Sequence, residues 1–134
     1  MADIVRYGVL STAQIALNRH LPAVQAAANS QVVALSSRDQ VRADKAAAEH
    51  GIAQAYGSYQ AVLDDPVVDA VINPLPNSLH CEWSVKAAEA GKHILCEKPL
   101  SVTVSESRKM IDAAQANGVL LVEAFTHRLN PQLQ

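Results

Sequence analysis

The sequence has few of the features that mark secreted, membrane-bound or metal-dependent proteins. Its two cysteines, Cys81 and Cys96, are too few for a disulfide framework and lack the Cys-x-x-Cys spacing of a metal site. No apolar run approaches the roughly 20 residues that span a bilayer. The first residues, MADIVRYGVLS, lack the basic stretch and long apolar run of a secretory signal. These absences predict a cytoplasmic protein with no bound metal and no membrane partner.

A surplus of charge of one sign is also missing. The formal net charge is −2, charged residues make up 18% of the chain, and no block of like charge occurs. This balance argues against nucleic acid or an anionic membrane surface as the partner. Apolar residues make up 49% of the 134 residues, which suits one domain with a hydrophobic core. No internal repeat, low-complexity tract or linker interrupts the chain.

Apolar runs of strand length alternate with segments of helical pattern along the whole chain. The expected strands are residues 4–10, 31–36, 53–56, 70–72, 93–96 and 119–124, and the expected helices are residues 13–28, 39–51, 59–63, 79–90 and 105–117. Strands that are apolar on both faces and alternate with helices indicate a parallel sheet covered on both sides. The prediction is a single α/β domain of the Rossmann type, a doubly wound parallel sheet of about six strands. Ligands bind such sheets beyond the carboxyl ends of the strands.

Glycine is missing from the turn after the first strand. In a dinucleotide-binding fold this turn carries G-x-G-x-x-G, but here Ser11, Ala13 and Ala16 stand at the three glycine positions. Alanine adds only a methyl group, and the helix after the turn still presents unpaired N–H groups and a positive dipole end to an anion. The turn therefore fits a phosphate site. An ordinary strand–turn–helix connection is the alternative.

An acidic residue is missing at the end of the second strand. Sites that select NAD place Asp or Glu there to bind the ribose 2′-hydroxyl, whereas this chain has Ser36, Ser37 and Arg38. Because arginine binds phosphate with several donors, the position favours NADP over NAD. The alternative is a solvated arginine with no ligand. Asp39 is interpreted as the cap of the next helix rather than as a ribose ligand.

The expected fifth strand runs without a spacer into Glu97, Lys98 and Pro99. This block belongs to a longer pattern: P-L-P-N-S-L-H at residues 74–80, A-G-K-H-I-L-C-E-K-P at residues 90–99 and E-A-F-T-H-R at residues 123–128. The pattern strongly resembles the glucose–fructose oxidoreductase, inositol dehydrogenase and rhizopine catabolism family (Gfo/Idh/MocA). Within that family it is most similar to the sugar-oxidising branch of glucose–fructose and aldose–aldose oxidoreductases. The resemblance covers nearly the whole chain.

The resemblance implies a role for each matching residue. Lys98 and Glu97 are the expected catalytic residues, with Lys98 bonded to the sugar hydroxyl and Glu97 holding Lys98. The expected cofactor-binding residues are Ser11, Thr12, Ala13, Gln14 and Ile15 at the pyrophosphate, Ser37 and Arg38 at the adenosine ribose, Leu75, Pro76, Asn77 and His80 along the middle, and Glu97, Lys98 and Arg128 at the nicotinamide. Without this resemblance, a surface Glu–Lys pair at a strand end remains the simpler interpretation.

The resemblance also implies a second domain. Residues 1–130 are expected to form the NAD(P)-binding Rossmann domain, and residues 131–134 the start of a linker to a substrate domain that this sequence does not include. The expected function is NADP binding for an aldose or polyol oxidoreductase, with a sugar substrate only in the two-domain setting and little turnover by this chain. The alternatives are a dinucleotide-binding module without catalysis and a self-associating module. A homodimer is expected.

Four further expectations concern single residues and bonds. Asn73 is interpreted as the last residue of the fourth strand, hydrogen-bonded to loop backbone. The Lys98–Pro99 bond is expected to be cis. The side chains of His20 and His50, on expected helices, are interpreted as solvated.

Overall fold

Six parallel strands form one sheet in the computed structural model, which describes residues 3–133. The strands are β1 (Val5–Val9), β2 (Ser30–Ser36), β3 (Gln54–Tyr56), β4 (Ala70–Asn73), β5 (His93–Cys96) and β6 (Leu121–Glu123). Their spatial order is β3-β2-β1-β4-β5-β6, and every neighbouring pair is parallel. This is the Rossmann strand order, so the predicted fold class is confirmed. The chain reverses its direction of winding between β1 and β4.

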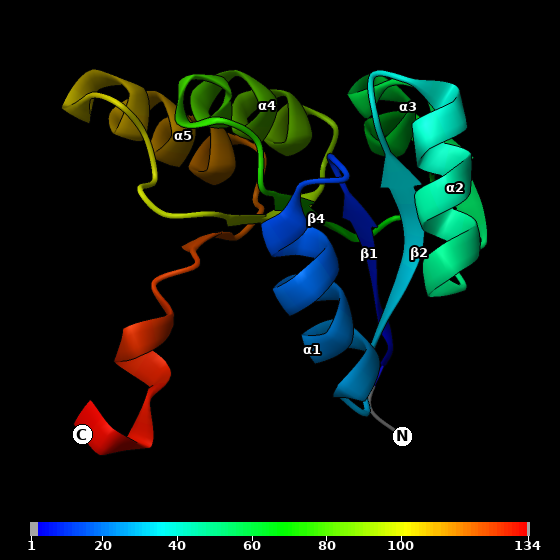
Figure 1. Ribbon diagram of the computed structural model, residues 1–134. Helices are drawn as coiled ribbons and strands as arrows, with labels where there is room; N and C mark the ends of the chain where they lie inside the picture. Colours follow the sequence, from blue (N-terminus) through cyan, green and yellow to red (C-terminus); the bar gives the residue numbers. More distant parts are fainter. Residues whose placement is uncertain (1–2, 134) are drawn as a thin grey trace.

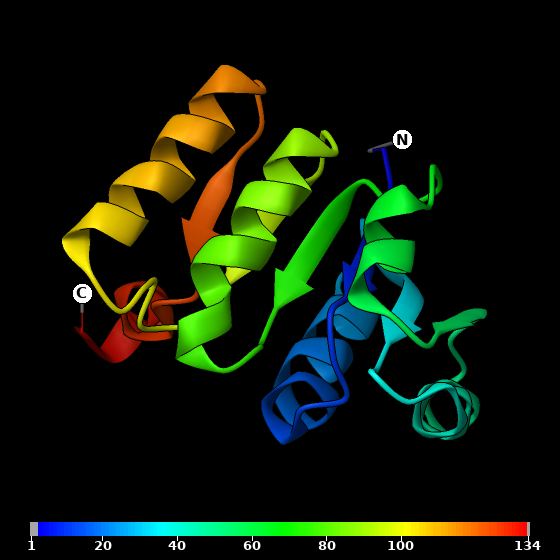
Figure 2. The same ribbon diagram turned by 90° about the horizontal axis from the view of Figure 1, so that it is seen from above.

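Helices cover both faces of the sheet (Figure 1). They are α1 (Leu21–Ala26), α2 (Gln40–His50), α3 (Tyr59–Asp64), α4 (Asn77–Glu89) and α5 (Val104–Ala116). One buried cluster joins α3, α4 and α5 to the sheet through residues such as Val62, Ala87 and Met110. A second cluster joins α1 and α2 to the opposite face through Leu21 and Ala46. Figure 2 shows α4 and α5 lying side by side over their face.

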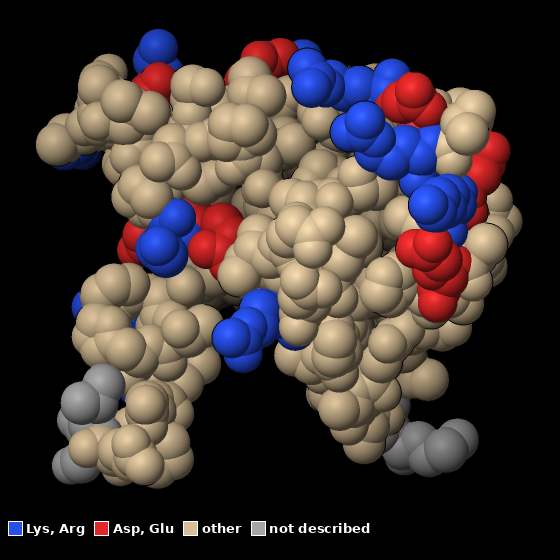
Figure 3. All heavy atoms as spheres, in the orientation of Figure 1, with Lys and Arg blue, Asp and Glu red and all other residues tan. Residues whose placement is uncertain are grey.

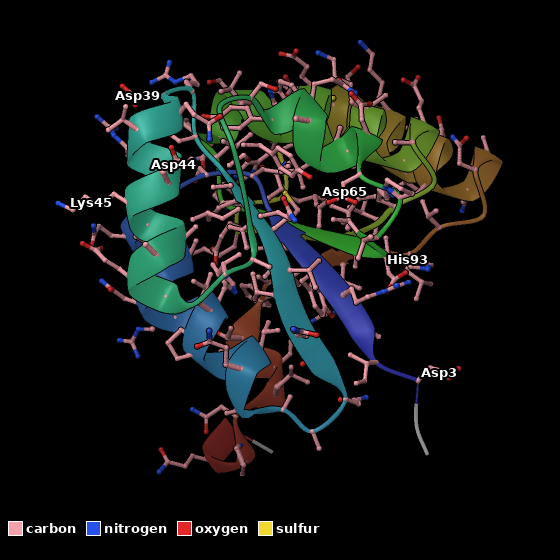
Figure 4. The ribbon with its side chains drawn as sticks, turned by 90° about the vertical axis from the view of Figure 1, so that its right-hand side faces the viewer. Asp3, Asp39, Asp44, Lys45, Asp65 and His93 are labelled. Carbon is pink, nitrogen blue, oxygen red and sulfur yellow. The ribbon has the colours of Figure 1, made fainter. Side chains whose placement is uncertain are left out.

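The helix boundaries have identifiable local causes. The Asp39 carboxylate accepts a hydrogen bond from the backbone N–H of Arg42 and begins α2, as the sequence predicted, and Gly51 ends it with φ at 67°. Figure 4 shows Asp39 at one end of α2, with Asp44 and Lys45 further along the helix. Thr103 and Glu106 form a reciprocal capping box at the start of α5.

The first helix departs from a regular α-helix. Its central residues, Ala16–His20, form a π-helical turn, and α1 comes directly after it. The N–H of Leu21 donates to the carbonyl of Ala16, five residues back. Pro22 explains the position of this turn, because a proline inside a helix has no N–H and crowds the carbonyl four residues before it. The wider turn relieves that crowding and changes the direction in which its side chains point.

The carboxyl ends of the strands lie along one edge of the sheet, where the loops after β1, β2, β4 and β5 meet. After β6 the chain continues through the short 3-10 segments Thr126–Leu129 and Pro131–Leu133 on the side of α1 (Figure 1). The predicted linker thus falls on the second of these segments, and Gln134 lies outside the described residues. Across residues 3–133, no helix is long and apolar enough to cross a membrane.

Candidate functional site

Two hollows lie at the carboxyl edge of the sheet, one on each side of the turn after β1. The first, here the arginine hollow, has a volume of about 200 Å³. Its lining residues are Ser11, Thr12, Ala13, Ser37, Arg38, Arg42, Tyr59, Pro74, Leu75 and Pro76. They come from the loops after β1, β2 and β4 and from the helices α2 and α3. Figure 3 shows basic side chains gathered near the N-terminal end of α2.

The arginine hollow offers cations and hydroxyl groups to a ligand. Arg38 and Arg42 are both exposed on its rim. Asp39, the acid between the two arginines in the sequence, is engaged as the cap of α2, with its carboxylate oxygen 2.9 Å from the backbone nitrogen of Arg42. Two guanidinium groups with an adjacent serine hydroxyl suit an anion with several oxygens, such as a phosphate monoester.

The turn after β1 separates the two hollows. The Ser11 hydroxyl accepts a hydrogen bond from the backbone N–H of Ala13 at 3.0 Å, which orders the turn. Ala16 is fully buried between helix and sheet, at the position where the dinucleotide fingerprint has its packing glycine. Alanine therefore fits this site without glycine. Gln14 lies at the exposed start of the helix, where its side chain accepts from Asn18.

The loop after β4 is held by a buried amide. Asn73 is the last residue of β4 and is fully buried. Its Nδ2 donates to the carbonyl of His80 and to Ser84 Oγ, and its Oδ1 accepts from the backbone N–H of Leu75. The bond to loop backbone predicted for Asn73 is thus confirmed. Every polar atom of the amide is used, so burying it costs little.

His80 ties the loop after β4 to the loop after β5. The ring is fully buried, with Nε2 2.7 Å from the carbonyl oxygen of Leu75 and Nδ1 2.9 Å from that of Pro99. A ring in this position can act on a ligand only through the two loops that it holds. The Lys98–Pro99 bond in the second loop is cis, as predicted.

The second hollow, here the lysine hollow, has a volume of about 520 Å³. Its lining residues are Ile15, Arg19, His20, Ala23, Glu97, Lys98, Ala124, Phe125, Thr126 and His127. They come from the first helix, the loop after β5 and the segment after β6. In Figure 3 this hollow lies between the main body and the C-terminal segment, with acidic and basic atoms at its edge.

Glu97 is held by a histidine from the first helix. Its Oε1 lies 2.7 Å from His20 Nε2, and its Oε2 accepts from the backbone N–H of Lys98 at 3.0 Å. The side chains of His20 and Glu97 are only 12% and 14% exposed. The prediction of a solvated His20 is therefore wrong, because its ring packs against the carboxylate of a residue 77 positions away in the sequence. The Glu97 carboxylate meets Lys98 at its backbone N–H, and the role expected for Glu97 beside the lysine side chain stays a prediction.

The neighbouring thiols are packing groups. Burial raises the pKa of Cys96 to about 12, and burial also raises the pKa of Cys81. A thiol with a raised pKa is protonated at neutral pH and is a poor nucleophile. Among the described residues, no three His, Cys, Asp or Glu side chains converge as a metal site requires.

Most of the predicted site residues come together at this edge. Ser11, Thr12, Ala13, Ser37, Arg38, Leu75 and Pro76 line the arginine hollow, and Ile15, Glu97 and Lys98 line the lysine hollow. Asn77 begins α4 beside them. Arg128 lies over the Phe125 ring, 5.9 Å from its centroid, and lines an adjoining hollow under β6.

The fold also brings to these hollows residues that the sequence analysis did not assign to the site. Arg42 and Tyr59 line the arginine hollow, while Arg19 and His20 line the lysine hollow. Arg42 had a recognisable signal, since it lies in the first turn of a capped helix, four residues after Arg38. Arg19 and His20 both belong to the π-helical turn, which the sequence pattern did not reveal.

A parallel sheet of this order, with an ordered turn between a cationic hollow and a lysine hollow, defines a dinucleotide-binding domain. The donors fit an NAD(P) molecule, with phosphate-binding groups at one end and a lysine at the other. The chain belongs to the Gfo/Idh/MocA oxidoreductase family. Residues 5–125 match the model of that family, described as "Oxidoreductase family, NAD-binding Rossmann fold".

Three relatives show how much of a known protein the chain matches. The chain is 47% identical to the "uncharacterized oxidoreductase ORF334" of Rhizobium meliloti, over 97% of this chain and 39% of that protein. It is 46% identical to D-xylose 1-dehydrogenase (NADP(+)) 2 of Haloferax volcanii, over 93% of this chain and 38% of that protein. The crystal structure of KijD10, a 3-ketoreductase from Actinomadura kijaniata in complex with NADP, superposes with a TM-score of 0.93 at 38% identity, over 97% of this chain and 41% of that one. The chain thus spans about two fifths of these relatives.

Proposed function

We propose that this chain binds NADP as the cofactor domain of an oxidoreductase that acts on a hydroxyl or carbonyl carbon of a sugar or polyol. The observation that carries the proposal is the pair of hollows on either side of the turn after β1. Arg38 and Arg42 line one hollow, and Lys98 lines the other. Two relatives agree with it, since one is a D-xylose 1-dehydrogenase (NADP(+)) and another was crystallised with NADP.

Selectivity for NADP rests on the arginine hollow. NADP differs from NAD by a phosphate on the adenosine ribose, and Arg38, Arg42 and Ser37 supply donors for that group. No acid of the hollow competes for the position, because the Asp39 carboxylate caps α2. Leu75 and Pro76 would flank the middle of the cofactor, and the turn from Ser11 to Ile15 would run along its pyrophosphate.

Lys98 is the proposed catalytic residue. The bound nicotinamide would supply the hydride chemistry. The Lys98 ammonium would donate a hydrogen bond to the oxygen of the reacting carbon and stabilise the negative charge that develops there. The sugar and its remaining acid–base groups would be contributed by the rest of a longer protein, as the length of the relatives suggests. By itself the chain is then a cofactor-binding module with little turnover.

Calorimetric titration with NADP⁺ and NAD⁺ tests this proposal. Charge-assisted hydrogen bonds contribute about 1.5–3 kcal/mol, so we expect NADP⁺ to bind roughly tenfold more tightly or better. Arg38→Ala should remove most of that preference. Arg108→Ala, on the exposed side of α5, is the matched control and should leave it unchanged. Equal affinities in the original chain, or an undiminished preference in Arg38→Ala, would refute the assignment.

A further inference from the structure

We infer that His20 and Glu97 form a positioning pair that sets the place of Lys98 at the nicotinamide end of the site. The inference rests on the proposed function and adds two roles to it. Glu97 is a positioning residue rather than an acid or base of the reaction, and His20, on the first helix, holds it. The sequence motif alone indicates neither of these two roles.

The contacts of the Glu97 carboxylate support this division of roles. One oxygen accepts from His20 Nε2 at 2.7 Å and the other from the backbone N–H of Lys98 at 3.0 Å. A carboxylate only accepts, so the imidazole is the donor of the first bond. With each oxygen engaged, Glu97 fixes the backbone of Lys98 and leaves the ammonium group for a ligand.

The burial of the pair makes its geometry specific. His20 and Glu97 are 12% and 14% exposed, and both line the lysine hollow beside Lys98. A hydrogen bond between a carboxylate and an imidazole is stronger in such a partly buried place than at the surface. The backbone of Glu97 is fixed as well, because its N–H donates to the carbonyl of Asn73 at 3.0 Å. The side chain of Glu97 thus has little freedom.

The first helix links the pair to the phosphate turn. Ile15, in the turn, and His20 lie on one continuous helical segment, and both line the lysine hollow. His20 is the last residue of the π-helical turn at Ala16–His20. The same helical segment thus contributes one residue to the turn and one to the pair.

The alternative is that the bond only stabilises the fold. A purely structural role would affect all ligands alike, whereas a positioning role at the nicotinamide end affects only ligands with a nicotinamide. Adenosine 2′,5′-bisphosphate carries the adenosine half of NADP and no nicotinamide, so it reports on the arginine hollow alone. Comparing it with NADP⁺ separates the two roles.

The experiment is calorimetric titration of the 134-residue chain and its variants with NADP⁺ and adenosine 2′,5′-bisphosphate. His20→Leu removes the donor, and His20→Gln keeps an N–H near the position of Nε2. Glu97→Gln keeps the size of the side chain but has only one oxygen to accept from the two donors, His20 Nε2 and the backbone N–H of Lys98. The double variant His20→Leu/Glu97→Gln completes a cycle that measures whether the two residues act together. Emission of bound NADPH reports the surroundings of the nicotinamide in each variant.

We expect His20→Leu and Glu97→Gln each to weaken NADP⁺ binding by about three- to tenfold, the range for one lost hydrogen bond. Binding of the bisphosphate should stay unchanged, His20→Gln should bind NADP⁺ nearly as the original chain does, and the double variant should be no weaker than either single one. NADPH emission should change in the two single variants.

Equal weakening of both ligands, or full NADP⁺ affinity in both single variants, overturns the inference while leaving the proposed function intact. If the original chain binds the bisphosphate and NADP⁺ equally well, the nicotinamide end contributes nothing and the inference also fails. If the original chain binds neither ligand, the proposed function fails and the inference fails with it. Should His20→Leu not fold, Glu97→Gln and His20→Gln decide the question by the same comparison.

Discussion

His80 is the residue on which two loops of the candidate site depend. Its ring lies between the carbonyls of Leu75 and Pro99, which belong to the loops after β4 and β5. His20 contacts Glu97 and His80 contacts Pro99, so histidines hold the residues directly before and after Lys98. The position of the proposed catalytic lysine therefore depends on side chains that need not touch the substrate.

Replacing His80 should destabilise the protein strongly. His80→Leu removes the fully buried ring that bridges the carbonyls of Leu75 and Pro99, and with it a buried hydrogen bond, so we expect a loss of about 1–3 kcal/mol in the free energy of unfolding. Urea denaturation followed by circular dichroism measures it. His50→Leu, at the partly exposed end of α2, is the control and should cost far less. A loss no larger than that of the control would contradict this account of the ring.

At the scale of residues, the sequence was enough to predict which side chains follow the strand ends. It was not enough to predict contacts between elements that are distant in the sequence. Ser11 and Arg38 were considered for the site because each stands just after a strand, and the carboxyl ends of parallel strands share one edge. Lys98 also follows a strand, but it was assigned through the resemblance that its motif carries. His20 was misjudged because its partner lies 77 positions away and is reached only through an irregular helical turn. No local pattern encodes such a contact.

At the scale of elements, all six strands and the five α-helices were expected from the sequence, with boundaries that differ by a few residues, whereas the π-helical turn and the two 3-10 segments after β6 were not expected. The apolar runs were clear because parallel strands are buried on both faces. The sixth strand is the largest discrepancy among the strands, since residues 119–124 were expected and only Leu121–Glu123 are extended and paired. It lies at the sheet edge with a single neighbour, so fewer residues find partners there.

The start of β1 is fastened to the start of β4 by an ion pair. The Arg6 guanidinium donates to both carboxylate oxygens of Asp69, and the Arg6 backbone N–H donates to one of them. These hydrogen bonds lower the pKa of Asp69 to about 2. A depressed pKa in the folded state means that the stabilisation is present above the unfolded value of about 4 and is lost as the pH falls toward 2.

We therefore expect Asp69→Asn to lower the melting temperature at neutral pH and the difference from the original chain to shrink between about pH 4 and pH 2. Thermal melts across this range, followed by circular dichroism, measure the difference. Asp112→Asn, on the exposed side of α5, is the matched control and should show a much smaller effect. A difference that stays constant down to pH 2 would show that the charge of Asp69 is not the cause.

At the scale of the whole molecule, one face of the sheet has less cover than the other. Among the described residues, α1 and α2 cover β1, β2 and β4 on their side, while Leu120, Val122 and Leu129 near β6 are 69%, 53% and 81% exposed. An adjoining hollow of about 490 Å³ lies here. Exposed apolar groups beside a strand edge favour association.

We predict that the chain forms a homodimer through this surface, because a two-fold pair buries the same apolar groups twice. Light scattering over a dilution series should give a mass about twice 14.3 kDa at high concentration. Val122→Glu should shift the equilibrium toward the monomer, since it places a charge in the buried contact. A constant mass of 14.3 kDa at every concentration would rule the dimer out.

Catalysis by the chain alone should be very weak. Lys98 is present, but positioning of a substrate contributes about 7–11 kcal/mol to catalysis, and the chain spans only about two fifths of its relatives. We expect no measurable steady-state formation of NADPH from glucose or xylose. Robust turnover that Lys98→Ala abolishes would show instead that residues 1–134 suffice.

The central claim is that one NADP molecule extends from the arginine hollow, past the turn after β1, to the lysine hollow. Backbone amide chemical shifts recorded by NMR during titration with NADP⁺ test it most directly. The account predicts that the largest changes fall at Ser11 to Ile15, at Ser37 and Arg38, and at Glu97 and Lys98, with little change along α5. Changes confined to one hollow, changes centred on β6, or none at saturating NADP⁺ would contradict it.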